Sequence, residues 1–380
     1  MKTQTEMTSF KSELPAQQRN AKKTGQKPFT PLQRRQLARN FRLDTNMANQ
    51  KVSCPLSSIR VTPLAAESFG VRSMCTLVET PDVVVLFDAG VSLCPWRCGL
   101  PPHPLEFQAI AKMRRKIAEA ASMAEVVTIS HYHFDHHTPS FEDWLVNWTE
   151  ANTTAKRIYQ GKTVLAKNPR EQINPSQRQR AWMFQQTGGK HAKTTLAADG
   201  KTFTYGKTQL RFSEPVAHGS QDSGLGWVIM AVVEFGDERF MFAPDVQGPM
   251  MQMTLETILK AEPTVAMIGG PPLYLEGSRV ETMQLELAVR NLEQIASSVP
   301  VTIVEHHALR GEEWQGRLGK VYEAASAAGH SVVTAAEYAG EENLFFESKR
   351  KQLYKEAPPT EKFLSWTKTL SSQNIAKPPL

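Results

Sequence analysis

Four histidines and one aspartate stand within seven residues of this 380-residue chain, in the stretch HYHFDHH that begins at His131. They directly follow the apolar run EVVTIS (125–130), which is typical of a buried strand. His131 and His133 are two positions apart, so an extended chain points both side chains the same way, toward one metal ion. Asp135 and His136 follow where the chain turns, and they can reach a second ion. Imidazoles beside a carboxylate suit Zn²⁺, Fe²⁺ or Mn²⁺.

The rest of the chain alternates between strand and helix patterns. Two hairpins are expected, one around Pro81-Asp82 and one around Gly236-Asp237, because turn residues there separate β-branched apolar runs. The residue patterns predict strands over 74–80, 83–90, 125–130, 299–307 and 330–338 and helices over 103–124 and 285–299. Helices that alternate with strands and hairpins favour an α/β fold, with two β-sheets packed together and the helices outside.

HYHFDHH resembles the HxHxDH signature of the metallo-β-lactamase fold, an αββα four-layer sandwich found in binuclear metallohydrolases. The other motifs of that family match Asp88 after an early strand, His218 at a strand end, Asp245 after the run RFMFAP, and the stretch EHHALR (305–310). The resemblance spans residues 60–340. SHYHFDHH, FAPDVQGP, GGPP and EHHALR together resemble a mostly archaeal branch of predicted metallohydrolases without an assigned substrate.

The resemblance implies a cofactor of two divalent metal ions, with Zn²⁺ favoured and Fe²⁺ or Mn²⁺ as alternatives. The first ion is expected on His131, His133 and His218, the second on Asp135, His136 and His306, and Asp245 is expected to be shared. The catalytic carboxylates in this scheme are Asp135 and Asp245. Supporting contacts to the ligands are expected from Asp88, His137 and His307.

The last ligand motif contains two adjacent histidines. Strand alternation sends His306 and His307 to opposite faces, so only one of them is expected to coordinate a metal. His306 is favoured, because Arg310 then follows at the offset seen in the related RNase Z-like enzymes. Arg310 is therefore also a candidate substrate contact.

Two such cations can bridge a water molecule and lower its pKa toward neutrality. The ligand set therefore predicts a hydrolase that uses a metal-bridging hydroxide and needs no Ser or Cys nucleophile. His133 stands where the related flavodiiron oxidases carry Glu, which favours a hydrolase over a redox enzyme.

The substrate is predicted from charge. Residues 156–193 hold nine basic residues and one acidic residue, directly after the histidine cluster, and they indicate a basic helical insert. Arg178 and Arg180 on that helix suit an anionic substrate such as a phosphodiester, a nucleotide or a nucleic-acid strand, and Trp182 and Phe184 could stack on bases. A solvated helix with inward-facing aromatic residues explains the same pattern. Hydrolysis of a carbon ester, such as a thioester or lactone, and a non-catalytic nucleic-acid-binding module with structural metals stay open as alternatives.

Three regions are expected along the chain: a basic, disordered extension over 1–50, with ten basic and three acidic residues, a hydrolase domain over 51–340, and a charged C-terminal tail over 341–380. No apolar run reaches the roughly 18 residues of a membrane span, and no secretory signal precedes the domain. Four cysteines in so long a chain fit a reducing cytoplasm. The sequence does not predict the oligomeric state.

Overall fold

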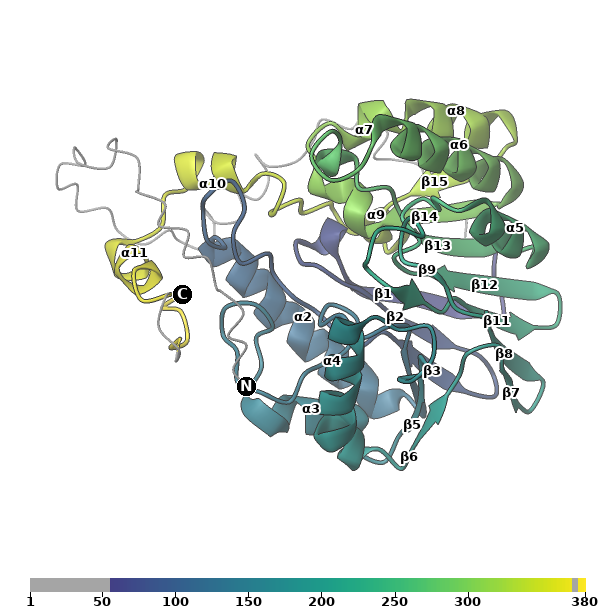
Figure 1. Cartoon of the computed structure of the whole chain (residues 1–380), viewed down its shortest axis with the longest axis horizontal. Helices are drawn as coiled ribbons and strands as arrows, with labels where there is room; N and C mark the ends of the chain where they lie inside the picture. Colours follow the sequence, from purple (N-terminus) through teal and green to yellow (C-terminus); the bar gives the residue numbers. More distant parts are fainter. Residues whose placement is uncertain (1–54, 371–374) are drawn as a thin grey trace, which may run out of the picture.

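The computed structural model describes residues 55–370 and 375–380, so the extension predicted over 1–50 lies outside the described residues. The chain forms two β-sheets that pack face to face, with helices on both outer sides (Figure 1). This architecture confirms the four-layer αββα sandwich expected from the sequence.

The first sheet holds six strands within the described residues, in the order β1-β2-β3-β4-β5-β6. They are β1 (Arg60–Ala66), β2 (Met74–Glu79), β3 (Val84–Phe87), β4 (Val126–Ile129), β5 (Thr163–Ala166) and β6 (Thr194–Ala197). The first three strands are antiparallel, as the predicted hairpin requires, and β3 to β6 run parallel. All four residues of β4 are buried, because this strand lies inside the sheet with both faces covered.

The second sheet holds seven strands in the described part of the chain, in the order β15-β14-β13-β12-β11-β8-β7. They are β7 (Thr202–Tyr205), β8 (Thr208–Phe212), β11 (Ala231–Phe235), β12 (Glu238–Ala243), β13 (Val265–Gly269), β14 (Val301–Glu305) and β15 (Ser331–Val333). β12 to β15 run parallel, and a two-stranded ribbon, β9 (Val216–Ala217) with β10 (Trp227–Val228), lies beside them. The strand predicted over 330–338 is wrong in its second half, because Thr334 caps a short helix there.

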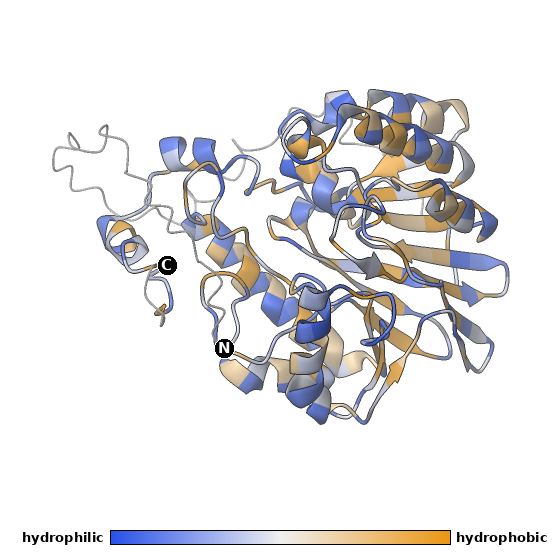
Figure 2. Ribbon diagram, in the orientation of Figure 1, coloured by the Kyte–Doolittle hydropathy of each residue, from blue (hydrophilic) through white to orange (hydrophobic). Residues whose placement is uncertain are grey.

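The apolar faces of the two sheets form the main core. Phe87 on β3 contacts Phe242 on β12 across the layers, with ring centroids 5.1 Å apart. Figure 2 shows the hydrophobic colouring concentrated along the strands, and blue segments along the outer helices. Burial of this shared surface is the main stabilising term of such a fold, at roughly 25 cal/mol per Å². It holds the strand ends of both sheets against each other.

Helices cover the outer faces of the sheets. The helices of the described residues are α2 (Pro104–Met123), α3 (Ala151–Tyr159), α4 (Pro175–Gln186), α5 (Gln252–Lys260), α6 (Thr282–Ser298), α7 (Trp314–Arg317), α8 (Gly319–Ala327), α9 (Ala335–Tyr338), α10 (Arg350–Glu356) and α11 (Glu361–Thr367). Of these, α10 and α11 lie beside α2 and away from both sheets (Figure 1). α2 begins at a capping box: His103 Nδ1 accepts from Leu105 N, and Glu106 accepts from His103 N. None of the helices in the described residues is both long and apolar enough to cross a membrane.

The segment predicted as a charged C-terminal tail is folded over its described residues. Arg350 is fully buried and donates two hydrogen bonds to Glu106 on α2, at 2.7 and 2.8 Å. Phe363 and Trp366 on α11 pack against Phe107 of the same helix. Charge composition missed this packing, because one buried arginine with a paired carboxylate looks like any surface cation in a sequence.

Acid is expected to weaken the link between this C-terminal segment and the first sheet. Glu347 accepts two hydrogen bonds from the Arg72 guanidinium, both at 2.6 Å. Burial would raise the pKa of Glu347, but the Arg72 charge outweighs it and lowers the pKa from 4.5 to about 2. A carboxylate with a lowered pKa in the folded state stabilises the protein above its unfolded pKa and loses that contribution as the pH falls.

This link is expected to contribute about 3 kcal/mol to the free energy of unfolding near pH 5, and to lose it progressively toward about pH 2. Urea unfolding at several pH values between these limits measures the effect. Glu347→Gln should be less stable near pH 5 and should show a flatter pH dependence. An equally steep loss in the variant would contradict the assignment.

Candidate metal centre

The predicted ligands lie at the carboxyl ends of strands from both sheets. Asp88 follows β3, Asp245 follows β12 and His306 follows β14, while the histidine cluster begins two residues after β4. β3 and β4 are parallel neighbours in one sheet, and β12 and β14 flank β13 in the other. Because parallel strands end at the same edge, both sheets deliver these side chains to one point.

The backbone is strained at three of these strand ends. Asp88, Asp245 and His306 have φ values of 45°, 51° and 64° in the left-handed region, which non-glycine residues rarely adopt. Such strain costs of order 1–3 kcal/mol per residue and persists where surrounding structure enforces it, often at functional sites. All three residues turn a side chain into the cluster.

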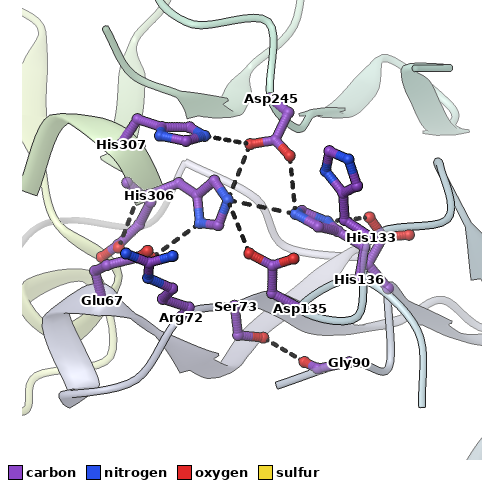
Figure 3. Close-up of polar contacts among 12 residues, drawn as sticks. Glu67, Arg72, Ser73, Gly90, His133, Asp135, His136, Asp245, His306 and His307 are labelled. Carbon is purple, nitrogen blue, oxygen red and sulfur yellow. Dashed lines mark hydrogen bonds and ion pairs between the residues drawn. The ribbon is translucent and has the colours of Figure 1, made fainter. Parts of the chain in front are cut away.

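The Asp245 carboxylate lies at the middle of the cluster. Its Oδ2 lies 3.0 Å from His131 Nε2, 3.1 Å from His136 Nε2 and 3.1 Å from His218 Nε2. Its Oδ1 lies 2.9 Å from His306 Nε2, yet makes no hydrogen bond of good geometry (Figure 3). Both oxygens are therefore surrounded by ring nitrogens and hidden from solvent.

Three of the histidines are held from outside the centre through Nδ1. The acceptors are Ser130 Oγ for His131 (3.0 Å), Asp88 Oδ2 for His136 (2.7 Å) and Glu67 Oε2 for His306 (3.0 Å). A neutral ring that donates through Nδ1 presents an unprotonated Nε2. Such a nitrogen faces the Asp245 oxygens as one acceptor faces another, a contact that is favourable only with a cation, either a proton or a metal ion, between them.

Protonation follows the same electrostatics. Burial, with the charge of His136 as a smaller contribution, lowers the pKa of His131 to about 3, so this ring is neutral at neutral pH. Burial acts the same way on His306, but the carboxylates of Asp245 and Glu67 outweigh it and raise the pKa of His306 to about 9. The pKa of Asp245 is well below its usual range despite burial, because His306 and His136 favour its charged form. The carboxylates thus draw cations into the centre, which are protons on His136 and His306 when no metal is bound.

The residues present fit divalent metals. His131, His133, His218 and Asp245 offer ligand atoms within 4.8 Å of one another, as do Asp135, His136 and His306. A third group joins Asp245 to His306 and His307. Imidazole nitrogens and carboxylate oxygens are the donor set of zinc and of first-row divalent metals. Asp245 Oδ1, buried without a hydrogen bond, is left available to a cation.

The expected separation of His306 and His307 to opposite faces is wrong. β14 ends at Glu305, and both histidines start the 3₁₀ turn η5 (His306–Arg310). Their ring centroids are 4.7 Å apart, and His307 Nε2 lies 3.4 Å from Asp245 Oδ1 (Figure 3). The strand period does not apply beyond the strand, so both rings face the centre, His306 buried and His307 partly accessible.

Glu67 was missed by the sequence reasoning. It lies in the 3₁₀ turn η2 (Glu67–Phe69), and its Oε1 accepts a hydrogen bond from Arg310 Nε at 2.7 Å while its Oε2 holds His306. Arg310, predicted as a substrate contact, is buried against Glu67, with its Nη2 3.7 Å from Asp135 Oδ2. No local pattern marks Glu67, because its partners are more than 230 residues away.

The C-terminal segment keeps η2 in place. Ser68 O accepts a hydrogen bond from Leu344 N at 2.7 Å, and Ser68 Oγ accepts one from Ala336 N at 3.0 Å. Glu305 Oε1 accepts from Ala335 N at 2.9 Å. Residues on both sides of position 340 therefore contact the turn that carries Glu67.

The histidine loop packs closely on the loop after β3. His137 Nδ1 donates a hydrogen bond to His133 O at 2.9 Å, so this ring orients the loop rather than reaching the cluster. A Cβ added at Gly90 would lie 2.3 Å from His137 N and 2.5 Å from His136 N. Only glycine fits at this close approach.

The structure separates the residues of the basic segment. Arg180 on α4 lies over the Phe134 ring at 4.9 Å, with Asp135 as its charged neighbour. Arg178 is exposed and points toward Arg170 O at 3.4 Å. Two positions along a helix are about 200° apart, so Arg178 faces away from Arg180.

Burial also divides the other members of this segment. Lys167 is fully buried in a salt bridge with Asp199, so it adds nothing to the positive charge of the surface. Phe184 packs inward, as the solvated-helix interpretation requires, whereas Trp182 is 60% exposed. Helix α4 forms where it was expected, and its status as an insert stays a prediction.

Comparisons with known proteins find close relatives in archaea. The UPF0282 protein of Methanopyrus kandleri is 44% identical over 295 residues, which cover 78% of this chain and 99% of that protein. The UPF0282 protein of Pyrobaculum islandicum is 40% identical over 298 residues, covering 78% and 95%. No family model matches the chain.

Among solved structures, the metallo-β-lactamase fold protein YhfI from Bacillus subtilis matches 73% of this chain and 96% of its own, with 12% identity and a TM-score of 0.42. The archaeal relatives agree with the branch that the motifs resembled, and they are matched over nearly their whole length. With 44% and 40% identity to these archaeal relatives over 78% of its length, the chain belongs to the UPF0282 family.

Proposed function

We propose that this protein is a metal-dependent hydrolase with a binuclear centre that acts on a phosphodiester-type anionic substrate. The observation that supports it most is the convergence of His131, His136 and His218 on one oxygen of a buried carboxylate, Asp245. Burying a carboxylate among so many imidazoles costs desolvation free energy, so the arrangement favours a role in binding cations.

The ligand atoms divide into two groups around Asp245. One group joins Asp245 to His131, His133 and His218, and the other consists of Asp135, His136 and His306, with His306 next to Asp245 Oδ1. Two divalent ions, Zn²⁺ before Fe²⁺ or Mn²⁺, would supply a nucleophile at neutral pH and offset charge on the substrate oxygen. The protein holds the ring orientations through Asp88 and Glu67 and excludes water from all but Asp135, His133 and His307.

The substrate class rests on Arg180. Within the described residues, this half-buried guanidinium makes no hydrogen bond and no salt bridge, although it lies near Asp135. Burial lowers the pKa of Arg180 without making it neutral in the physiological range. A cation held beside the centre without a hydrogen bond or salt bridge to any described residue favours a substrate that carries negative charge.

Removal and return of metal tests the proposal. Chelator-treated protein should not hydrolyse bis(p-nitrophenyl) phosphate, and addition of Zn²⁺, Mn²⁺ or Fe²⁺ should restore activity together with about two ions per chain by elemental analysis. Phenyl thioacetate serves as the carbon-ester control. The phosphodiester should be the better substrate by kcat/KM.

Faster hydrolysis of the thioester would favour the carbon-ester alternative. Two bound metals with no turnover of either compound would favour a non-catalytic module.

A further inference from the structure

Two arginine–aromatic pairs flank the accessible side of the metal centre. The ligands His131, His136 and His306 are at most 1% exposed, whereas the side chains of Asp135 and His307 are 17% and 13% exposed. Asp135 and His307 lie on opposite sides of the His306 ring (Figure 3). A substrate that reaches the centre therefore approaches it from the side on which Asp135, His133 and His307 are accessible.

The first pair is Arg180 with Phe134, next to Asp135. The Arg180 guanidinium carbon lies 4.9 Å from the centroid of the Phe134 ring, and Phe134 immediately precedes Asp135 in the chain. Helix α4 is fixed by Phe184, which packs against Tyr159 with ring centroids 5.1 Å apart. The guanidinium is thus held by packing over Phe134 and stays partly exposed.

The second pair is Arg97 with Tyr274, next to His307. The Arg97 guanidinium carbon lies 4.6 Å from the centroid of the Tyr274 ring, and Tyr274 Oη lies 3.5 Å from His307 Nδ1. Arg97 Nη2 donates a hydrogen bond to Arg310 O at 2.6 Å, which ties the pair to the turn that carries His306. Both pairs combine a positive charge with a flat surface.

We propose that these two pairs bind the two substituents of one phosphodiester whose phosphorus lies at the metal centre. The inference rests on the proposed function and narrows its substrate to a diester with a planar group on each side, as in a dinucleotide or a short single strand. Guanidinium planes stack on nucleobases, and their charge favours the flanking phosphates. A single pair would suffice for a monoester or a simple anion.

Two esters with the same leaving group separate the two sides. Bis(p-nitrophenyl) phosphate carries a second planar group where methyl p-nitrophenyl phosphate carries a methyl group, so the ratio of their kcat/KM values measures recognition of the non-leaving substituent. The wild type should prefer the first ester. Of the variants Arg180→Met and Tyr274→Leu, the one whose pair binds the non-leaving substituent should lower the ratio of the two kcat/KM values about tenfold. The other variant, whose pair binds the leaving group, should lower both kcat/KM values about tenfold.

Binding without turnover gives an independent readout. Calorimetry with the dinucleotide ApA in the presence of EDTA should show binding to the wild type that each of the two variants weakens about tenfold. Lys156→Met, which removes an exposed cation of the same basic segment on α3, should bind as the wild type does. The proposal is overturned if ApA does not bind the wild type, or if neither variant changes its affinity or the ester preference.

The two proposals fail in different ways. Binding of ApA through both pairs, without hydrolysis of any diester by metal-loaded protein, would reject the proposed function and keep the two-sided site. Metal-dependent hydrolysis with an unchanged ester preference in both variants would keep the proposed function and reject the two-sided site.

Discussion

Asp245→Asn is expected to remove both metals and nearly all hydrolysis. The carboxylate faces three ring nitrogens through Oδ2 and His306 through Oδ1, so both of its oxygens are needed. An amide keeps one acceptor oxygen and no charge. Elemental analysis should fall from about two ions per chain to fewer than one, and kcat/KM for bis(p-nitrophenyl) phosphate should fall on the order of a thousandfold.

Asp237→Asn provides the matched control. It changes an exposed aspartate in the turn that joins β11 and β12, at the opposite end of the strand that leads to Asp245. This variant should keep its metals and its activity. Thermal unfolding of all three proteins after chelation separates loss of metal from loss of fold. If Asp245→Asn bound two ions and turned over at the wild-type rate, Asp245 would not be the shared ligand.

The parts of the centre that local sequence predicts are those at strand ends. A buried run such as EVVTIS requires a strand, and polar residues directly after it must lie at the edge of a sheet. His131 was identified in that way and His218 and Asp245 as matches to the motifs of the family that the sequence resembles, and the structure brings both histidines within hydrogen-bond distance of Asp245. Alternation of strands and helices likewise predicted the four layers, because few architectures bury such elements.

The parts that local sequence does not predict depend on where a strand stops and on distant partners. His306 and His307 were assigned to opposite faces because β14 was extended through both, whereas the left-handed backbone at His306 ends the strand at Glu305, two residues earlier. Arg350 was read as part of a charged tail, although Glu106, 244 positions earlier, makes it a core residue. Propensity and periodicity describe neighbours in sequence, and neither contains this information.

Glu67 combines both difficulties, and its replacement has the second large expected effect. A carboxylate that holds the outer nitrogen of a metal-binding histidine typically changes metal affinity about 10-fold to 100-fold when it is lost. Glu67→Gln should therefore weaken the ion bound by Asp135, His136 and His306, and leave the ion of His131, His133 and His218 in place. Competition with a chelator should show one ion lost at a lower chelator concentration than in the wild type.

Glu67→Gln should also lower the free energy of unfolding, because Arg310 loses the carboxylate that it pairs with. Leaving one member of a buried ion pair unpaired typically costs about 3–5 kcal/mol. The double variant Glu67→Leu/Arg310→Met removes both charges, so it should recover much of the stability lost in Glu67→Gln and still bind the second ion weakly. If metal binding recovers along with stability in the double variant, Glu67 only supports the fold. If metal binding stays weak in the stable double variant, Glu67 is the residue that orients His306.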